Sequence, residues 1–210
     1  MKARCLAVVS LGLFPITGAA QALARDSVVY ELAPSSRLVV RTGKAGLLSF
    51  AGHEHLVQAR EFSGRIVYYP DQPGASHVSV SIATERLEVL TPPDTAEIRK
   101  VTAALRVDVL DVAHYAEINL TSQSVEAAGD TLRVRAALTM KGQTRTVPLM
   151  VRVRIGPDTL RATATFKVRQ SDYGIRPYRG GPGGTVRVAD AVTFDIDAVA
   201  LRRAPLPPPR

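Results

Sequence analysis

The chain has 210 residues, of which 46% are hydrophobic and 22% are charged, a composition typical of a globular protein. A net charge of +8 would suit nucleic-acid binding, but the arginines are spread along the chain and only 5% of the residues are aromatic. We therefore predict no nucleic-acid partner. We interpret the charge as that of a solvated exterior with weak attraction for anionic membrane surfaces.

The first 24 residues have the pattern of a secretory signal peptide. Lys2 and Arg4 form a short positive segment, residues 5–20 are mostly apolar, and small residues precede the expected cleavage site after Ala24 or two residues earlier. The apolar part is too short for a transmembrane anchor, and a buried N-terminal helix is the alternative interpretation. Cys5 is the only cysteine, so we predict a periplasmic mature protein without disulfides.

Alternation of apolar and polar residues dominates the rest of the chain. It is strongest in 131–140, 147–155 and 160–168, which are separated by turns at 141–142 and 156–158 and predict an antiparallel meander. Weaker alternation in further segments raises the total to about eight strands, a number that closes into a barrel around one small ligand. These weaker segments are 28–32, 36–42, 65–69, 76–83, 117–125 and 191–200.

One segment has helical periodicity instead. Asp94 and Glu97 have the spacing of a capping box, and apolar residues recur at helical spacing as far as Leu105. We predict a helix from about Asp94 to Leu105 and a short helical turn near 109–113.

The chain contains no internal linker. We therefore predict one domain over residues 25–201, followed by a disordered proline-rich tail over 202–210. The sequence leaves open whether the protein is a monomer or a homodimer.

Small residues on the predicted inward faces indicate a hollow interior. A filled core would favour larger side chains at these central positions, because protein interiors are densely packed. With few aromatic residues, the lining would be aliphatic and would suit a prenyl or acyl chain. The alternative is a filled core in a structural envelope protein. The residues predicted to contact the ligand are Ala136, Leu138, Val151, Val153, Ala162, Ala164 and Phe166.

His53 and His55 are the strongest candidates for a metal site, because in a strand they would share one face and could chelate zinc or copper. Two ligands are not enough, and the sequence does not bring His77 or His114 near them. We predict no metal and no cofactor, and retain a metal- or haem-binding envelope protein as the alternative function.

A flexible basic loop follows the last turn signal. Arg176 and Arg179, together with the backbone amides of the glycines in residues 180–184 (GGPGG), could hold a phosphate headgroup, although an ordinary solvated loop is the competing interpretation.

The sequence contains no motif that indicates catalysis. It lacks a serine-nucleophile motif, a phosphate-binding loop and a dinucleotide-binding pattern. Asp172 and Tyr173 could form an acid–base pair, but the surrounding residues favour a turn. We predict that the protein is not an enzyme.

Short phrases distributed from about Tyr30 to Ala200 have a characteristic order and spacing. The most specific are 138–147 (LTMKGQTRTV) and 171–175 (SDYGI); the others are 30–32 with 35–36, 61–64, 105–106, 109–112 and 115–118. Together they resemble the lipid/polyisoprenoid-binding YceI-like family of bacterial periplasmic proteins.

This resemblance implies a lipocalin-like antiparallel barrel whose elongated interior holds an isoprenoid chain or a similar amphiphile. The chain departs from the family at three positions: Tyr30 replaces the usual Trp, Ala116 the usual Pro and Lys141 a frequent His. Because ligands differ within the family, the resemblance implies a periplasmic carrier of an isoprenoid or other long-chain lipid without specifying the lipid.

N-terminal sequencing of protein recovered from the periplasm tests the export prediction. The first residue should be Arg25, or Leu23 if cleavage falls two residues earlier. A soluble mature protein that retains Met1 would contradict the prediction.

Overall fold

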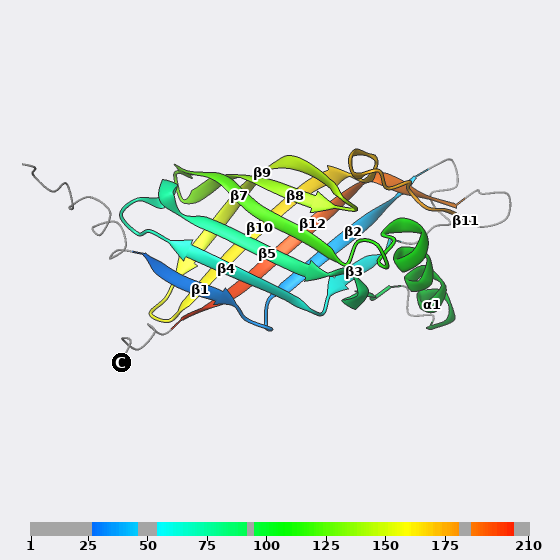
Figure 1. Cartoon of the computed structure of the whole chain (residues 1–210), viewed down its shortest axis with the longest axis horizontal. Coiled ribbons are helices and arrows are strands. Elements are labelled where there is room, and N and C mark those ends of the chain that lie inside the picture. The colour runs from blue at the N-terminus through cyan, green and yellow to red at the C-terminus, as the bar shows by residue number, and fades with distance from the viewer. Residues whose placement is uncertain (1–26, 46–53, 92–94, 181–185, 204–210) are drawn as a thin grey trace, which may run out of the picture.

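The computed structural model describes residues 27–45, 54–91, 95–180 and 186–203, and these are mostly β-structure. In Figure 1 antiparallel strands surround one interior, and the barrel closes where β12 pairs with β1. The prediction of a single antiparallel barrel of about eight strands is confirmed. In order around the barrel, the strands are β1 (Val28–Leu32), β4 (Phe62–Tyr68), β5 (His77–Ala83), β7 (Glu117–Ala128), β8 (Thr131–Met140), β9 (Gln143–Ile155), β10 (Thr159–Arg169) and β12 (Val186–Arg202).

Three of these strands continue as shorter strands toward the end of the barrel that carries the helix. The first of the shorter strands along the chain pairs with β12 beside β1, the second pairs with the first, and the third pairs with the second. At the break after β1, the Ser36 hydroxyl donates to the Val199 carbonyl (2.9 Å) and accepts from the Val199 N–H (3.0 Å), which holds the break against β12. The shorter strands are β2 (Arg37–Ala45), β3 (Leu56–Ala59) and β6 (Leu87–Val89), and β11 (Arg179–Gly180) pairs separately with β12.

The helix α1 (Thr95–Ala104) lies at one end of the barrel and confirms the predicted helix (Figure 1). The second helical turn is a π-helical turn, η4 (Leu105–Val109), so its predicted position at 109–113 is wrong. Asp111 has a φ of 53°, and its carbonyl accepts from the His114 and Tyr115 N–H groups, which closes a turn there. Neither α1 nor any other helix in the described ranges is long and apolar enough to cross a membrane.

Three shorter 3-10 turns connect the strands: η2 (Pro73–Ala75), η3 (Thr84–Arg86) and η5 (Gln170–Tyr173). The predicted signal peptide lies outside the described residues, as do His53 and residues 204–210 of the predicted tail. At the start of that tail, Arg202 belongs to β12 and the Arg203 N–H donates to the Val29 carbonyl (2.8 Å).

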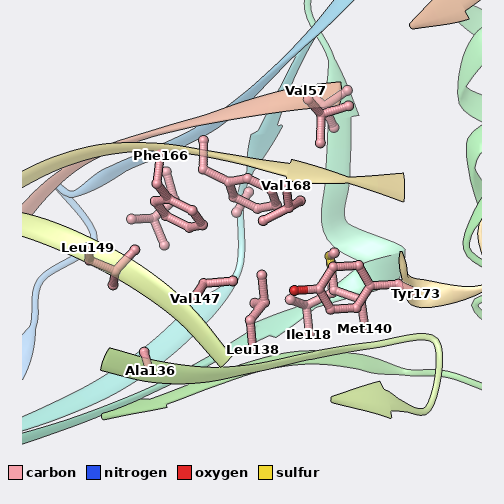
Figure 2. Close-up of a cluster of buried hydrophobic side chains, with 14 of the residues drawn as sticks. Val57, Ile118, Ala136, Leu138, Met140, Val147, Leu149, Phe166, Val168 and Tyr173 are labelled. Carbon is pink, nitrogen blue, oxygen red and sulfur yellow. The ribbon is translucent and has the colours of Figure 1, made fainter. Parts of the chain in front are cut away.

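The interior is apolar because inward and outward residues alternate along the strands. On β8, for example, Ala136 and Leu138 are buried while Arg133 and Arg135 are exposed. The main core cluster, shown in part in Figure 2, lines the helix end and the middle of the barrel. A smaller cluster of Tyr30, Leu160 and Ala200 fills the β1 end.

The turn between β8 and β9 depends on Gly142, which has a φ of 71°. A Cβ atom on Gly142 would lie 2.9 Å from the ring of Tyr115. The backbone of Tyr115 is held in place, because its carbonyl accepts a hydrogen bond from the Thr84 hydroxyl (2.8 Å), so the ring can move away only by rotating about its side-chain bonds.

We therefore expect Gly142→Ala to lower the free energy of unfolding by about 2 kcal/mol, combining the penalty of a positive φ with the ring contact. Gly129→Ala is the matched control, because Gly129 has a similar φ of 64° but an open environment; it should lose only about 1 kcal/mol. Urea denaturation of both variants measures the difference, and equal losses would show that the contact with Tyr115 is unimportant.

Candidate ligand cavity inside the barrel

An apolar cavity of about 100 Å³ lies inside the barrel at the end that carries α1. Sixteen of its eighteen lining residues are hydrophobic and none is charged; the two polar residues are Thr42 and Gln170. Such a lining can bury an apolar chain, whereas it offers no partner to a charged group.

The lining comes from elements that are far apart in the sequence. The short strands contribute residues such as Leu38 and Val57, the segment after α1 contributes Leu105 and Val109, and β12 contributes Phe194. The cavity therefore depends on the breaks that divide the strands at this end of the barrel.

The η5 turn brings polar groups to the interior and is held firmly on β12. The Ser171 N–H and hydroxyl donate to the Asp190 carboxylate (2.9 and 2.7 Å), and Gln170 Nε2 donates to the Ala189 carbonyl (2.9 Å). The hydrogen bonds from the Ser171 side chain and backbone lower the pKa of Asp190, so this carboxylate stays charged and keeps the turn in place at neutral pH.

Asp172 and Tyr173 face opposite environments, as expected for a turn. Asp172 is exposed, whereas Tyr173 is only 1% exposed. Burial, and then the negative charge of Asp172, raise the pKa of the Tyr173 phenol, while the positive charge of Arg145 lowers it by a smaller amount. The phenol is therefore protonated at neutral pH, and it has no hydrogen-bond partner among the described residues.

The seven residues predicted to contact a ligand lie on inward faces, but none of them lines this cavity. Four of them form two adjacent cross-strand pairs between β9 and β10, Val151 with Ala164 and Val153 with Ala162. The second pair packs against the small cluster at the β1 end.

The first of these pairs connects with the cavity. Ala164 is also in register with Ile196 of β12, which lines the cavity. Val151 and Ala164 are partly exposed, and Ala164 and Ile196 also line a groove on the outside of the barrel. Toward the interior, Ala164 contributes only a methyl group to this layer.

The other three predicted residues lie in the main cluster shown in Figure 2. Ala136 and Leu138 are completely or almost completely buried on β8. Phe166 stacks on Phe194 with ring centroids 4.9 Å apart, and Phe194 lines the cavity.

A larger groove of about 570 Å³ lies on the outer face of β2, β9, β10 and β12. Its lining includes Arg37, Arg41, Arg152, Asp195 and Asp197, and Arg41 forms an ion pair with Asp195 at 2.6 Å. The internal cavity is the better candidate for an apolar ligand despite its smaller volume, because these charged groups would lose hydration under an apolar chain.

The structure assembles no metal site in the residues it describes. His55 Nδ1 lies 2.8 Å from the Thr91 carbonyl, a distance at which this nitrogen donates a hydrogen bond. No group of three or more histidine, cysteine, aspartate or glutamate residues is placed to hold a metal within the described ranges.

Arg176 and Arg179 are both exposed on the segment between η5 and β12. The glycine-rich residues that were expected to complete a headgroup site, 181–184, lie outside the described residues.

The cavity residues from β2, β3, η4 and η5 were not among the predicted ligand residues. Alternation in 36–42 and the helical spacing of Leu105 were visible signals for part of this lining. The rest, such as the packing of η5 against β9 and β12, depends on contacts between distant segments and could not be found from one sequence.

The YceI-like domain model matches residues 30–200, from the first strand of the barrel to the last. The chain therefore belongs to the YceI-like family, which confirms the resemblance identified in its sequence phrases. No curated protein shows significant sequence similarity to it.

Solved structures share this fold over most of the chain. BcnA of Burkholderia cenocepacia has 17% identity and a TM-score of 0.64, covering 80% of this chain and 98% of BcnA. A polyisoprenoid-binding domain of Saccharophagus degradans, implicated in plant cell wall breakdown, has 14% identity and a TM-score of 0.60, with 84% and 99% covered. A Campylobacter jejuni YceI protein has 14% identity and a TM-score of 0.54, with 70% and 85% covered. At these identities the similarity concerns the fold.

Proposed function

We propose that the protein binds an amphiphilic lipid with a long apolar chain, such as a polyprenyl compound, in the barrel interior and carries it through the periplasm. The single observation that supports this most strongly is the cavity with an almost entirely hydrophobic, uncharged lining. Membership of the YceI-like family supports the same function, as does the structural similarity to a polyisoprenoid-binding domain.

The cavity of about 100 Å³ is smaller than most ligand pockets, so a long chain needs additional space. We place the rest of the chain along the seven residues that the sequence predicted, beginning at the layer of Val151, Ala164 and Ile196. Ala164 contributes only a methyl group to this layer, so we expect the lipid chain to meet little side-chain volume there. A chain that follows it would reach the pair of Val153 and Ala162 before the filled β1 end.

Binding would be driven by removal of the apolar chain from water, which contributes about 25 cal/mol per Å² of buried apolar area before the costs of association. In this proposal the protein transports a bound lipid and does not catalyse a reaction. The positive exterior would favour brief contact with anionic membrane surfaces, where the lipid would be loaded or released. The predicted signal peptide would place the protein in the periplasm.

Lipid extraction and mass spectrometry of the purified protein test this function, with Ala164→Phe as the blocking variant. In a hollow barrel, the phenylalanine ring would occupy the space of the ligand, so lipid should be lost while stability changes by less than about 1 kcal/mol. Thr163→Phe is the control, because Thr163 is exposed on the outward face next to Ala164. This variant should retain the lipid.

A filled barrel would behave differently. The parent protein would then carry no lipid, and Ala164→Phe would lower stability by about 1–3 kcal/mol through overpacking. That result would contradict the carrier function and support a structural envelope protein with a filled core.

A further inference from the structure

The Tyr173 hydroxyl is an unpaired hydrogen-bonding group inside an apolar core. The residue is 1% exposed, and the hydroxyl has no hydrogen-bond partner among the described residues. A buried hydroxyl without a partner is unfavourable, because it has given up its hydrogen bonds to water without replacement.

The geometry directs this hydroxyl into the apolar interior of the barrel; Tyr173 does not itself line the cavity, but Gln170 and Ile175 on either side of it in the sequence do. Figure 2 shows the ring entering from η5 with its oxygen pointing into the main cluster of apolar side chains. That cluster includes Ile118 and Met140, which both line the cavity. The attachment of η5 to β12 through Ser171 and Gln170 keeps the ring in this direction.

From this geometry we infer that the Tyr173 hydroxyl donates a hydrogen bond to a neutral oxygen atom of the bound lipid, and so selects an oxygen-bearing end group. This inference rests on the proposed lipid-binding function and specifies its ligand. The lipid would lie with its oxygen near η5 and its apolar chain directed toward Ala164.

The chemistry of the cavity favours a neutral oxygen over a phosphate. No charged residue lines the cavity, so a buried phosphate would lack a countercharge. The raised pKa of Tyr173 keeps the phenol protonated, and a protonated phenol is a suitable donor to an alcohol, ether or carbonyl oxygen. Gln170 is a second polar group from the same turn that lines the cavity.

The test compares two probes on delipidated full-length protein: geranylgeraniol, a C20 prenyl alcohol, and the C20 hydrocarbon that lacks the hydroxyl. Calorimetric titration should show that the unmodified protein binds the alcohol more tightly. Tyr173→Phe should weaken alcohol binding about tenfold, the effect of one neutral hydrogen bond, and leave hydrocarbon binding unchanged. Tyr178→Phe is the control, because Tyr178 is 43% exposed and should have no effect on either probe.

The outcomes separate this inference from the proposed function. If the unmodified protein binds neither probe, the lipid-binding function is wrong and the inference falls with it. If both probes bind and Tyr173→Phe does not weaken alcohol binding, the function stands and the inference is overturned.

A second measurement uses the unmodified protein and covers the case in which Tyr173→Phe does not fold. The infrared carbonyl stretch of bound geranylgeranial, the corresponding aldehyde, should lie below its frequency in hexane because a hydrogen bond weakens the C=O bond. A bound stretch equal to that in hexane would overturn the inference.

Discussion

The seventeen-residue strand β12 pairs through backbone hydrogen bonds with four strands: β1, β2, β10 and β11. One of its edges pairs with β10 over eleven residues, and its other edge pairs with β1 and then with β2. Without it, each of these strands would have an open edge, and open edges pair readily with other chains. Because the strands form one closed sheet, the alternation of apolar and polar residues has a single consequence, an apolar interior surrounded by a charged exterior.

The way this interior is filled changes along the barrel and determines where a ligand fits. At the β1 end, Tyr30, Leu160 and Ala200 form a buried cluster. In the middle, Ala164 contributes only a small side chain, and at the helix end the broken strands leave a cavity. Tyr173 adds the only unpaired buried hydroxyl among the described residues, within the main cluster that includes residues of the cavity lining. The interior therefore changes from an apolar end to an end with a polar group, which matches the shape of an amphiphile.

The sequence predicted the barrel, because its strongest signals are local. The segment 131–140 coincides with β8, and the periodicity that ends at Leu105 predicted α1 to within one residue at its end. The separate segments 28–32 and 36–42 predicted the break after β1, but the short strands β3 and β6 were not predicted, because they are defined by pairings such as that of Val57 with Val89, which are far apart in the sequence. Alternation also indicates whether a residue faces inward or outward, but it does not indicate at which height along the barrel a cavity remains. For that reason, the predicted ligand residues and the observed cavity lie in neighbouring layers.

Photolabelling measures most directly whether the interior of the barrel holds a lipid chain. A geranylgeraniol analogue with a diazirine near the end of its chain would be bound, irradiated and located by mass spectrometry at the level of single residues. A lipid chain inside the barrel should give labels on inward residues that do not line the outer groove, such as Ala162 and Phe166 of β10, with competition by unlabelled geranylgeraniol. Labels confined to outward residues, such as Thr163 and Asp197, would show that the lipid binds on the surface and would contradict the account.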